Sequence, residues 1–259
     1  MNPLITPRAA AEITLSAIPK LAEEDVPPEQ ARGRILALPL VADRPLPPYD
    51  RVMMDGICCK NSDLEEHTTL AIAGDHPAGA PTPQQTPRGH CWEVMTGACL
   101  PPDCDTVIPY EQISRQDHHF TIEAGSAVAG RFIHRRASDY ETGEILVPPN
   151  TVIDSRVAAV AATVGATTLR VLQRPRVALF TTGDEVVDPT STPADHEIRQ
   201  SNAAALHAAL SAAGAELAHY QHLPDDPGAT LTAVEKHRNC DLLILCGGIS
   251  KGKYDFVRP

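Results

Sequence analysis

The sequence lacks the features that mark membrane proteins and secreted proteins. No run reaches the roughly 18 consecutive apolar residues that a membrane-spanning helix needs. The start, Met1-Asn-Pro-Leu-Ile5, has neither the basic residues nor the apolar core of a signal peptide. We therefore expect a cytoplasmic protein with no membrane partner.

Basic residues are in the minority, with 22 Lys and Arg against 33 Asp and Glu. A general nucleic-acid binder needs a basic surface that attracts the phosphates, and this composition does not supply one. We expect no nucleic-acid partner.

The seven cysteines are odd in number and include no Cys-x-x-Cys pair, which argues against a disulfide framework and against a structural zinc site. We expect reduced thiols that pack as small side chains. The doublet His118-His119 has no acidic ligand at metal spacing, and we expect it on the surface.

At 259 residues the chain exceeds one typical compact domain, and most of its 24 prolines precede residue 195. We expect an α/β multidomain protein with three parts. They are a discontinuous helical and extended linker domain (1–43 and 139–172), a small β domain (44–138) and a three-layer α/β domain with a parallel or mixed sheet (173–259).

Apolar residues at helical spacing after Thr6 predict a helix within 6–24, with Thr6 as its N-cap. A second short helix is expected at 28–37. Prolines then exclude regular structure over 40–50, which should be a stiff extended connector. A further helix at 156–164 should stop at Gly165.

Short runs rich in Pro, Gly, Thr and Val between 44 and 138 predict a barrel-like β domain, with strands at 69–73, 106–110 and 120–122. From Arg174 onward strand and helix patterns alternate, which is typical of a parallel sheet covered by helices. The expected strands are 176–180, 216–221 and 241–246, and the expected helices are 201–213 and 227–237, capped by Ser201 and Asp226. A sheet of three strands leaves a long edge unpaired, so we expect this domain to be incomplete.

Two of these strands end in glycine-bearing polar turns. The apolar run Leu242-Leu-Ile-Leu-Cys246 leads into Gly247-Gly-Ile-Ser250, and Arg176-Val-Ala-Leu-Phe180 leads into Thr181-Thr-Gly-Asp-Glu185. Ligands of open α/β sheets bind beyond the carboxyl ends of the strands, where glycine lets backbone N–H groups approach an anion. We predict the binding site at these two turns.

Four polar clusters place a carboxylate or hydroxyl beside or near glycine, which suits a hard cation or an anion. Any one of them alone is most often a simple turn. The clusters are Met54-Asp55-Gly56, Met95-Thr96-Gly97, Asp139 with its neighbours, and Thr182-Gly183-Asp184-Glu185.

In order, these motifs resemble the MoeA-type molybdopterin molybdenumtransferases, a family that includes the gephyrin E domain. The similarity covers essentially the whole chain. It is carried by 46–56 (LPPYDRVMMDG), 94–98 (VMTGA), 100–107 (LPPDCDTV), 174–185 (RPRVALFTTGDE), 198–202 (IRQSN) and 247–252 (GGISKG).

The resemblance implies a role in molybdenum cofactor synthesis, in which adenylylated molybdopterin is cleaved, molybdate is placed on the dithiolene and AMP is released. It also implies Mg²⁺ as a cofactor, a homodimer, a possible Mog-type adenylyltransferase as partner, and a MoaB/Mog-like fold for the last domain. Magnesium held by carboxylates and phosphate oxygens is compatible with cleavage of a pyrophosphate bond.

The resemblance also implies roles for individual residues. The catalytic set is Asp55, Asp139, Asp184 and Asp255. The cofactor-binding set is Thr96, Gly183, Glu185, Ser201, Asn202, Gly247, Gly248, Ser250 and Lys251. The metal ligands are Asp184, Glu185 and Asp255.

The sequence departs from the family in several places. Members continue through a Lys-Pro-Gly-Lys-Pro segment, a Gly-Asn-Pro loop and a C-terminal β domain, none of which this sequence contains, so we expect a truncated chain. Val52-Met53 and Cys58-Cys59 flank Met54-Asp55-Gly56 with unusual side chains. Ala137-Ser138 replaces a common glycine and acid, and Gln200 replaces a residue that is often acidic.

Two alternatives stay open from the sequence. The chain could bind molybdopterin without turnover, as a fragment or an interaction module. A nucleotide-processing enzyme would explain the strand and Gly-Gly turn, but it leaves the first 170 residues unexplained.

Overall fold

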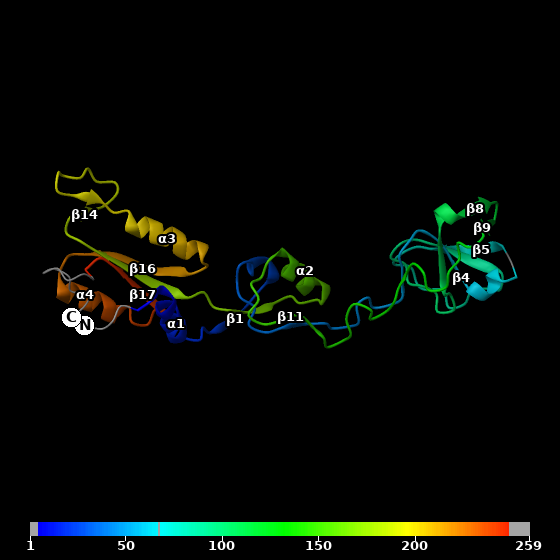
Figure 1. Cartoon of the computed structure of the whole chain (residues 1–259), viewed down its shortest axis with the longest axis horizontal. Helices are drawn as coiled ribbons and strands as arrows, with labels where there is room; N and C mark the ends of the chain where they lie inside the picture. The colour runs from blue at the N-terminus through cyan, green and yellow to red at the C-terminus, as the bar shows by residue number, and fades with distance from the viewer. Residues whose placement is uncertain (1–4, 67, 249–259) are drawn as a thin grey trace. The chain divides into compact units, whose positions relative to one another are not determined.

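The computed structural model describes residues 5–66 and 68–248, and the chain divides into two compact units (Figure 1). Unit 1 comprises Met1–Leu38, Pro149–Ala162 and Ala166–Pro259, and unit 2 comprises Pro39–Pro148 with Thr163–Gly165. Across the described ranges, no helix is long and apolar enough to cross a membrane.

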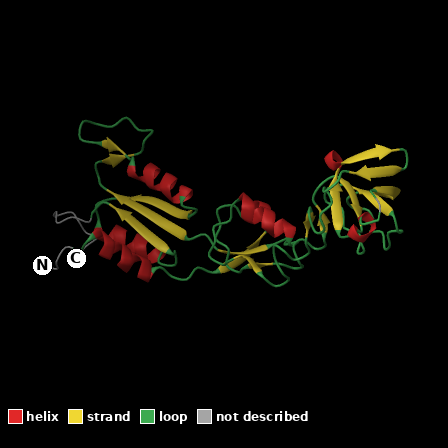
Figure 2. Cartoon of the chain, turned by 45° about the vertical axis from the view of Figure 1, so that its right-hand side comes forward, coloured by secondary structure: helices red, strands yellow, loops and turns green. Residues whose placement is uncertain are grey.

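Unit 2 is built on one six-stranded sheet in the order β7-β4-β6-β5-β9-β8. All neighbouring strands are antiparallel except β5 and β6. The expected barrel-like β domain is therefore confirmed as an open, curled sheet (Figure 2). Its strands are β4 (Gly56–Cys59), β5 (Thr69–His76), β6 (His90–Val94), β7 (Thr106–Pro109), β8 (Ile113–Gln116) and β9 (His119–Ile122).

Both faces of this sheet are packed. Successive side chains of a strand point to opposite faces, and Cys58 and Cys59 accordingly lie in two different apolar clusters. All four residues of β4 are buried.

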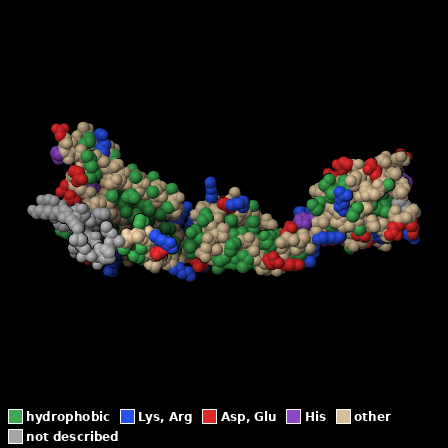
Figure 3. Space-filling view, in the orientation of Figure 1, with side chains coloured by type: hydrophobic (Ala, Val, Ile, Leu, Met, Phe, Trp, Pro, Cys, Tyr) green, Lys and Arg blue, Asp and Glu red, His purple; other side chains and the backbone are tan. Residues whose placement is uncertain are grey.

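All seven cysteines are free thiols, as predicted, and His118 and His119 are exposed. Acidic and basic side chains lie among one another over the face of unit 2 in Figure 3.

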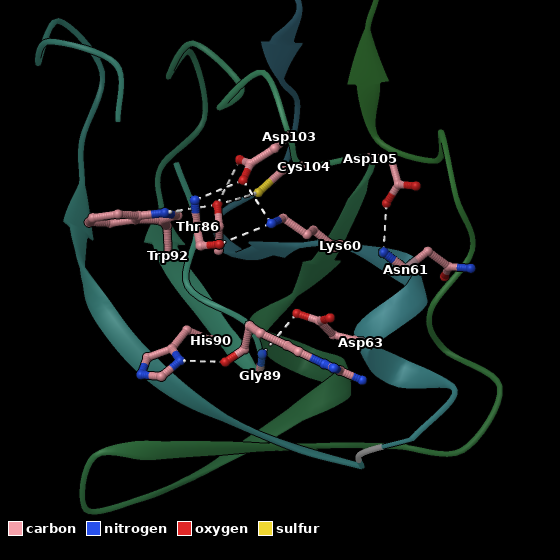
Figure 4. A network of polar contacts seen from close by, with 11 residues as sticks. Lys60, Asn61, Asp63, Thr86, Gly89, His90, Trp92, Asp103, Cys104 and Asp105 are labelled. Atoms are coloured by element: carbon pink, nitrogen blue, oxygen red, sulfur yellow. Dashed lines mark hydrogen bonds and ion pairs between the residues drawn. The ribbon is translucent and has the colours of Figure 1, made fainter. Parts of the chain in front are cut away.

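A polar network ties two loops of unit 2 together (Figure 4). The backbone N–H of buried Thr86 donates to Asp103 Oδ2 at 2.8 Å, and the Thr86 hydroxyl donates to Asp103 Oδ1 at 2.9 Å. Trp92 Nε1 donates to the Thr86 hydroxyl, and Lys60 bridges Asp103 Oδ2 and the Thr86 carbonyl. Burial favours the neutral carboxyl, but the bonds from Thr86 and Lys60 prevail and lower the pKa of Asp103.

The remaining strands of unit 2 form two short antiparallel pairs. β3 (Arg51–Val52) pairs with β10 (Ile133–His134), and β2 (Leu40–Val41) pairs with β11 (Ile145–Val147). Two turns of 3-10 helix, Asn61–Leu64 and Tyr110–Gln112, complete the unit.

Unit 1 begins with the predicted helix, α1 (Pro7–Ala17), which Thr6 caps by accepting from the N–H of Ala9. β1 (Glu23–Val26) then pairs antiparallel with β12 (Leu169–Leu172). The helix predicted at 156–164 is α2 (Ser155–Thr163).

The helix predicted at 28–37 is wrong, because only Pro28–Gln30 forms a 3-10 turn. Gly33 has φ of +76°, a left-handed conformation that ends helical structure. Ile35 and Leu36 instead form isolated β-bridges with Val152 and Val171. Contacts far along the sequence thus override the local helical pattern.

The main sheet of unit 1 is parallel, in the order β16-β13-β17, with strands close to the predicted ones. The strands are β13 (Arg176–Thr182), β16 (Glu216–Leu223) and β17 (Leu242–Cys246), and the helices are α3 (Asn202–Ala212) and α4 (Pro227–Lys236). The two helices cover opposite faces of the sheet (Figure 2). This follows because the connection through α3 leads from β13 to β16, whereas the connection through α4 leads back across β13 to β17, and both are right-handed. Ala178 and Phe180 pack with Ala233 of α4. Thr181 points to the other face.

Candidate functional site

The two glycine turns predicted from the sequence are neighbours at the carboxyl edge of the parallel sheet. β13 and β17 pair through Thr181 and Cys246, so the turns that follow them meet. Gly247 has φ of +110°, and a Cβ there would lie 2.4 Å from Thr182 Oγ1. A side chain at Gly247 would be strained by the positive φ and would collide with the side chain of Thr182.

The turn after β13 is compact and exposes its acidic side chains. Gly183 is buried with φ of +132°, and a Cβ there would lie 2.7 Å from Glu185 Oε2. The Gly183 carbonyl accepts the N–H of Val186 at 3.1 Å. Asp184 and Glu185 are both exposed, so their carboxylates are free to meet a ligand or cation.

The structure adds Asp225 to this turn, a residue that the sequence did not indicate. The backbone N–H of Asp225 donates to Asp184 Oδ1 at 3.1 Å, and the N–H of Asp184 donates to Asp225 Oδ2 at 3.4 Å. The sequence could have indicated Asp225 by its position just after β16. The end of β16 pairs with the end of β13 through Leu223 and Thr182. Parallel strands end at one edge, so their following residues converge.

A chain of hydrogen bonds supports the turn from the α3 face of the sheet. Gln200 Nε2 donates to Thr181 Oγ1 at 2.9 Å, and Thr181 Oγ1 lies 2.9 Å from His222 Nδ1. His222 Nε2 lies 3.1 Å from the Gly183 carbonyl. A carbonyl only accepts, so His222 carries a proton on Nε2 and can accept the Thr181 hydroxyl at Nδ1.

The predicted Ile198-Arg-Gln-Ser-Asn202 motif lies beside the same turn. β14 (Val186–Val187) pairs in parallel with β15 (Ile198–Arg199), and the N–H of Ile198 donates to the Glu185 carbonyl. Ser201 occupies the N-cap position of α3, but the prediction that its side chain caps the helix is wrong. Gln200 Oε1 accepts from the N–H of Ala203 instead, and Ser201 and Asn202 are exposed.

Part of the predicted site cannot be placed. Gly248, with φ of +63°, is the last described residue of the second glycine turn. Ser250, Lys251 and Asp255 lie outside the described residues. Among the residues that the structure describes, no group of three or more His, Cys, Asp or Glu side chains could hold a metal ion.

Unit 2 brings together two of the predicted site residues, Asp55 and Thr96. Asp55 Oδ1 accepts the Thr96 N–H at 2.6 Å and the Thr96 hydroxyl at 2.7 Å. The backbone bond is the larger cause, ahead of the hydroxyl bond, of a pKa of Asp55 below its usual range. Asp55 is therefore a carboxylate at neutral pH.

Asp139 lies in a second polar cluster of unit 2. His134 Nε2 bonds Asp139 Oδ1 at 2.9 Å, and His134 Nδ1 lies 2.8 Å from Arg51 Nη2. The arginine can only donate, so Nδ1 accepts and the proton donated to Asp139 is on Nε2. Ala137 has φ of +63°, a left-handed conformation that glycine adopts with less strain than a residue with a side chain.

Comparison with known proteins agrees with this arrangement. Residues 5–165 match the model of the MoeA N-terminal region (domain I and II), and residues 178–259 match that of a probable molybdopterin binding domain. The molybdopterin molybdenumtransferase of Synechocystis sp. is 34% identical over 98% of this chain and 66% of its own length. That of Nostoc sp. is 32% identical over 99% of this chain and 61% of its own.

A solved structure of a similar protein shows the same fold. The MoeA protein of Pyrococcus horikoshii superposes with a TM-score of 0.85 at 25% identity, over 94% of this chain and 66% of that one. The chain thus spans about two thirds of the length of the relatives it matches. The family resemblance read from the motifs is confirmed, and the chain belongs to the MoeA family.

Proposed function

We propose that this chain contributes to the last step of molybdenum cofactor synthesis, the insertion of molybdate into adenylylated molybdopterin with release of AMP. The observation that carries the proposal is the convergence of the Gly183 and Gly247 turns with Asp184, Glu185 and Asp225 at one sheet edge. Glycine turns of this kind admit an anion, and the carboxylates admit a cation that neutralises it. The names of the relatives agree with this activity.

Magnesium fits the donor set of this edge. Asp184 and Glu185 expose hard oxygen ligands, and magnesium is commonly held by one or two carboxylates together with substrate phosphates. When bound there, it would neutralise charge on the pyrophosphate. Asp184 and Glu185 would hold the ion, and the proposal keeps Asp255 as a third ligand.

The remaining roles belong to the same proposal. Ser250 and Lys251 would bind the pterin nucleotide with the glycine turns, Ser201 and Asn202. Asp55, Thr96 and Asp139 of the β domain would take part in the chemistry. The protein would act as a homodimer in the cytoplasm, and a Mog-type adenylyltransferase would supply its substrate. Sedimentation analysis of the purified chain tests the homodimer.

Calorimetric titration of the purified chain with adenylylated molybdopterin and magnesium tests the proposal. Asp184→Asn keeps the size and a hydrogen-bond acceptor but removes the charge, and we expect it to weaken binding about tenfold. Asp195→Asn, an equal charge change at an exposed residue of the same unit, is the matched control and should bind like the parent. Absence of binding by the folded parent chain would refute the proposal.

A further inference from the structure

A cavity of about 320 Å³ lies on the α3 face of the parallel sheet. Its apolar lining residues include Val186, Pro189, Ala203 and Ala204. None of the described site residues predicted from the sequence lines it. Ligand pockets begin at roughly 300 Å³, so the cavity has room for one planar ring system.

The charge of the cavity selects against anions. Among the described residues no lysine or arginine lines it, and its one acidic group is Asp188. Asp188 Oδ1 accepts the hydroxyl and the backbone N–H of Thr190, and these bonds lower the pKa of Asp188. Asp188 Oδ2 has no hydrogen bond within the part of the chain that the structure describes, so it is available to a ligand donor.

The other polar groups of the cavity are held in fixed positions. Gln200 donates one N–H to Thr181 and accepts from Ala203, which leaves one N–H and one lone pair of its amide unused. His222 uses both ring nitrogens, toward Thr181 and the Gly183 carbonyl. Tyr220 also lines the cavity, and the residue is 42% exposed. The cavity therefore offers a carboxylate, an amide and an aromatic ring in a preorganised setting.

We propose that this cavity is a subsite for a planar nitrogen heterocycle that presents N–H donors to Asp188. The unbonded oxygen of a carboxylate can accept from two adjacent N–H groups, and the apolar residues can contact the faces of a flat ring. Gln200 supplies a further donor and acceptor at the ring edge. Through Gln200 and His222, the cavity wall is bonded directly to the turn that carries Asp184.

The inference deepens the proposed function, on which its choice of ligand rests. A pterin nucleotide contains two such heterocycles, the pterin and the adenine. The pterin has an amino group next to a ring N–H, and both donors can point to the unbonded Oδ2 of Asp188. Adenine has an amino group next to an acceptor nitrogen. The shared chemistry is the flat ring with an amino donor, and the two sources are separated by experiment.

The experiment is calorimetric titration of the purified chain with 6-hydroxymethylpterin, with adenosine and with inorganic phosphate, each at millimolar concentration. Ala204→Leu fills the cavity from the exposed surface of α3, and Asp188→Asn removes the charge. Ala208→Leu, an exposed position of the same helix that does not line the cavity, is the matched control. Circular dichroism melting shows whether each variant is folded.

We expect a ring to bind the parent and the Ala208→Leu chain equally, and Ala204→Leu to abolish that binding. A tenfold or greater loss of the pterin on Asp188→Asn assigns the pterin, whereas tighter binding of adenosine assigns the adenine. The inference is overturned if neither ring binds the folded parent, or if Ala204→Leu binds both as the parent does. Any binding of inorganic phosphate should be the same for the parent and for Ala204→Leu, because no lysine or arginine is among the described residues that line the cavity.

Titration with adenylylated molybdopterin shows whether a failure concerns this inference or the proposed function. If it binds parent and Ala204→Leu equally, the subsite is wrong and the proposed function stands. If the isolated ring binds at the cavity but adenylylated molybdopterin does not bind the chain, the subsite stands and the proposed function fails.

Discussion

At the scale of single residues, Gly56 shows how a predicted site turn depends on the absence of a side chain. A Cβ at Gly56 would lie 2.1 Å from the Ile108 carbonyl oxygen of β7. Gly56 cannot easily move away, because its strand β4 is paired with β6 on one side and with β7 on the other. Gly56→Ala must therefore push β7 away, and we expect it to lower the free energy of unfolding of unit 2 by about 3 kcal/mol or more. Urea unfolding followed by the fluorescence of Trp92, the single tryptophan, measures this.

The control for this variant is Gly125→Ala. Gly125 also has a positive φ, +80°, but nothing lies within 4 Å of its added Cβ. Only backbone strain opposes the change, so we expect a loss of about 1 kcal/mol. Equal losses for the two variants would contradict the steric explanation.

The carboxylate of Asp55 offers a second residue-scale prediction. Its pKa is lowered in the folded chain by the N–H and the hydroxyl of Thr96, so its stabilising contribution is present above the unfolded pKa of about 4 and is lost as pH falls through the folded value. Thr96→Val removes the hydroxyl bond and should raise the pKa of Asp55. Carboxyl chemical shifts followed by NMR from pH 2 to 6 would show this, and superimposable curves would contradict it.

At the scale of elements, the two helices of the α/β part differ in how they begin. Asp226 Oδ1 accepts the N–H of Ala229 at 2.7 Å and caps α4, as predicted, whereas Ser201 makes no such bond at the start of α3. Asp226→Ala should therefore cost about 1 kcal/mol of stability. Ser201→Ala should cost close to nothing. Chemical denaturation followed by circular dichroism compares the two, and an equal loss would contradict the assignment of the caps.

Most elements of the α/β part could be predicted from the sequence, because their periodicity and turn residues agree with the tertiary fold. The strand predicted at 176–180 is β13, and the helix predicted at 227–237 is α4. The segment 28–37 could not be predicted, since Ile35 and Leu36 form β-bridges with Val152 and Val171, over 100 residues away. The local pattern of apolar residues does not indicate pairing partners that are so distant in the sequence.

Only some residues of the candidate site could be predicted from the sequence. Glycines 183 and 247 marked the sheet edge because strand runs lead into them. Asp225 was missed because its neighbour Asp226 accounts for the helix start, and only the pairing of β16 with β13 brings Asp225 to Asp184. His222 was missed because its role appears only through Thr181 and Gly183.

At the scale of the whole molecule, the residues implied by the family are divided between the two units. Asp55, Thr96 and Asp139 belong to unit 2, whereas Asp184 and Glu185 belong to unit 1. In our proposal the sheet edge of unit 1 carries ligand binding. The roles in the chemistry that we propose for Asp55, Thr96 and Asp139 belong to unit 2.

Hydrogen exchange of the chain with and without adenylylated molybdopterin and magnesium tests that claim most directly, because it reports where the ligand lies. We predict protection in peptides that cover 181–187 and 222–226, which contain the carboxyl ends of β13 and β16 and the residues that follow them. Asp184→Asn should reduce this protection at equal ligand concentration. A ligand that binds but leaves the exchange of both segments unchanged would contradict the account.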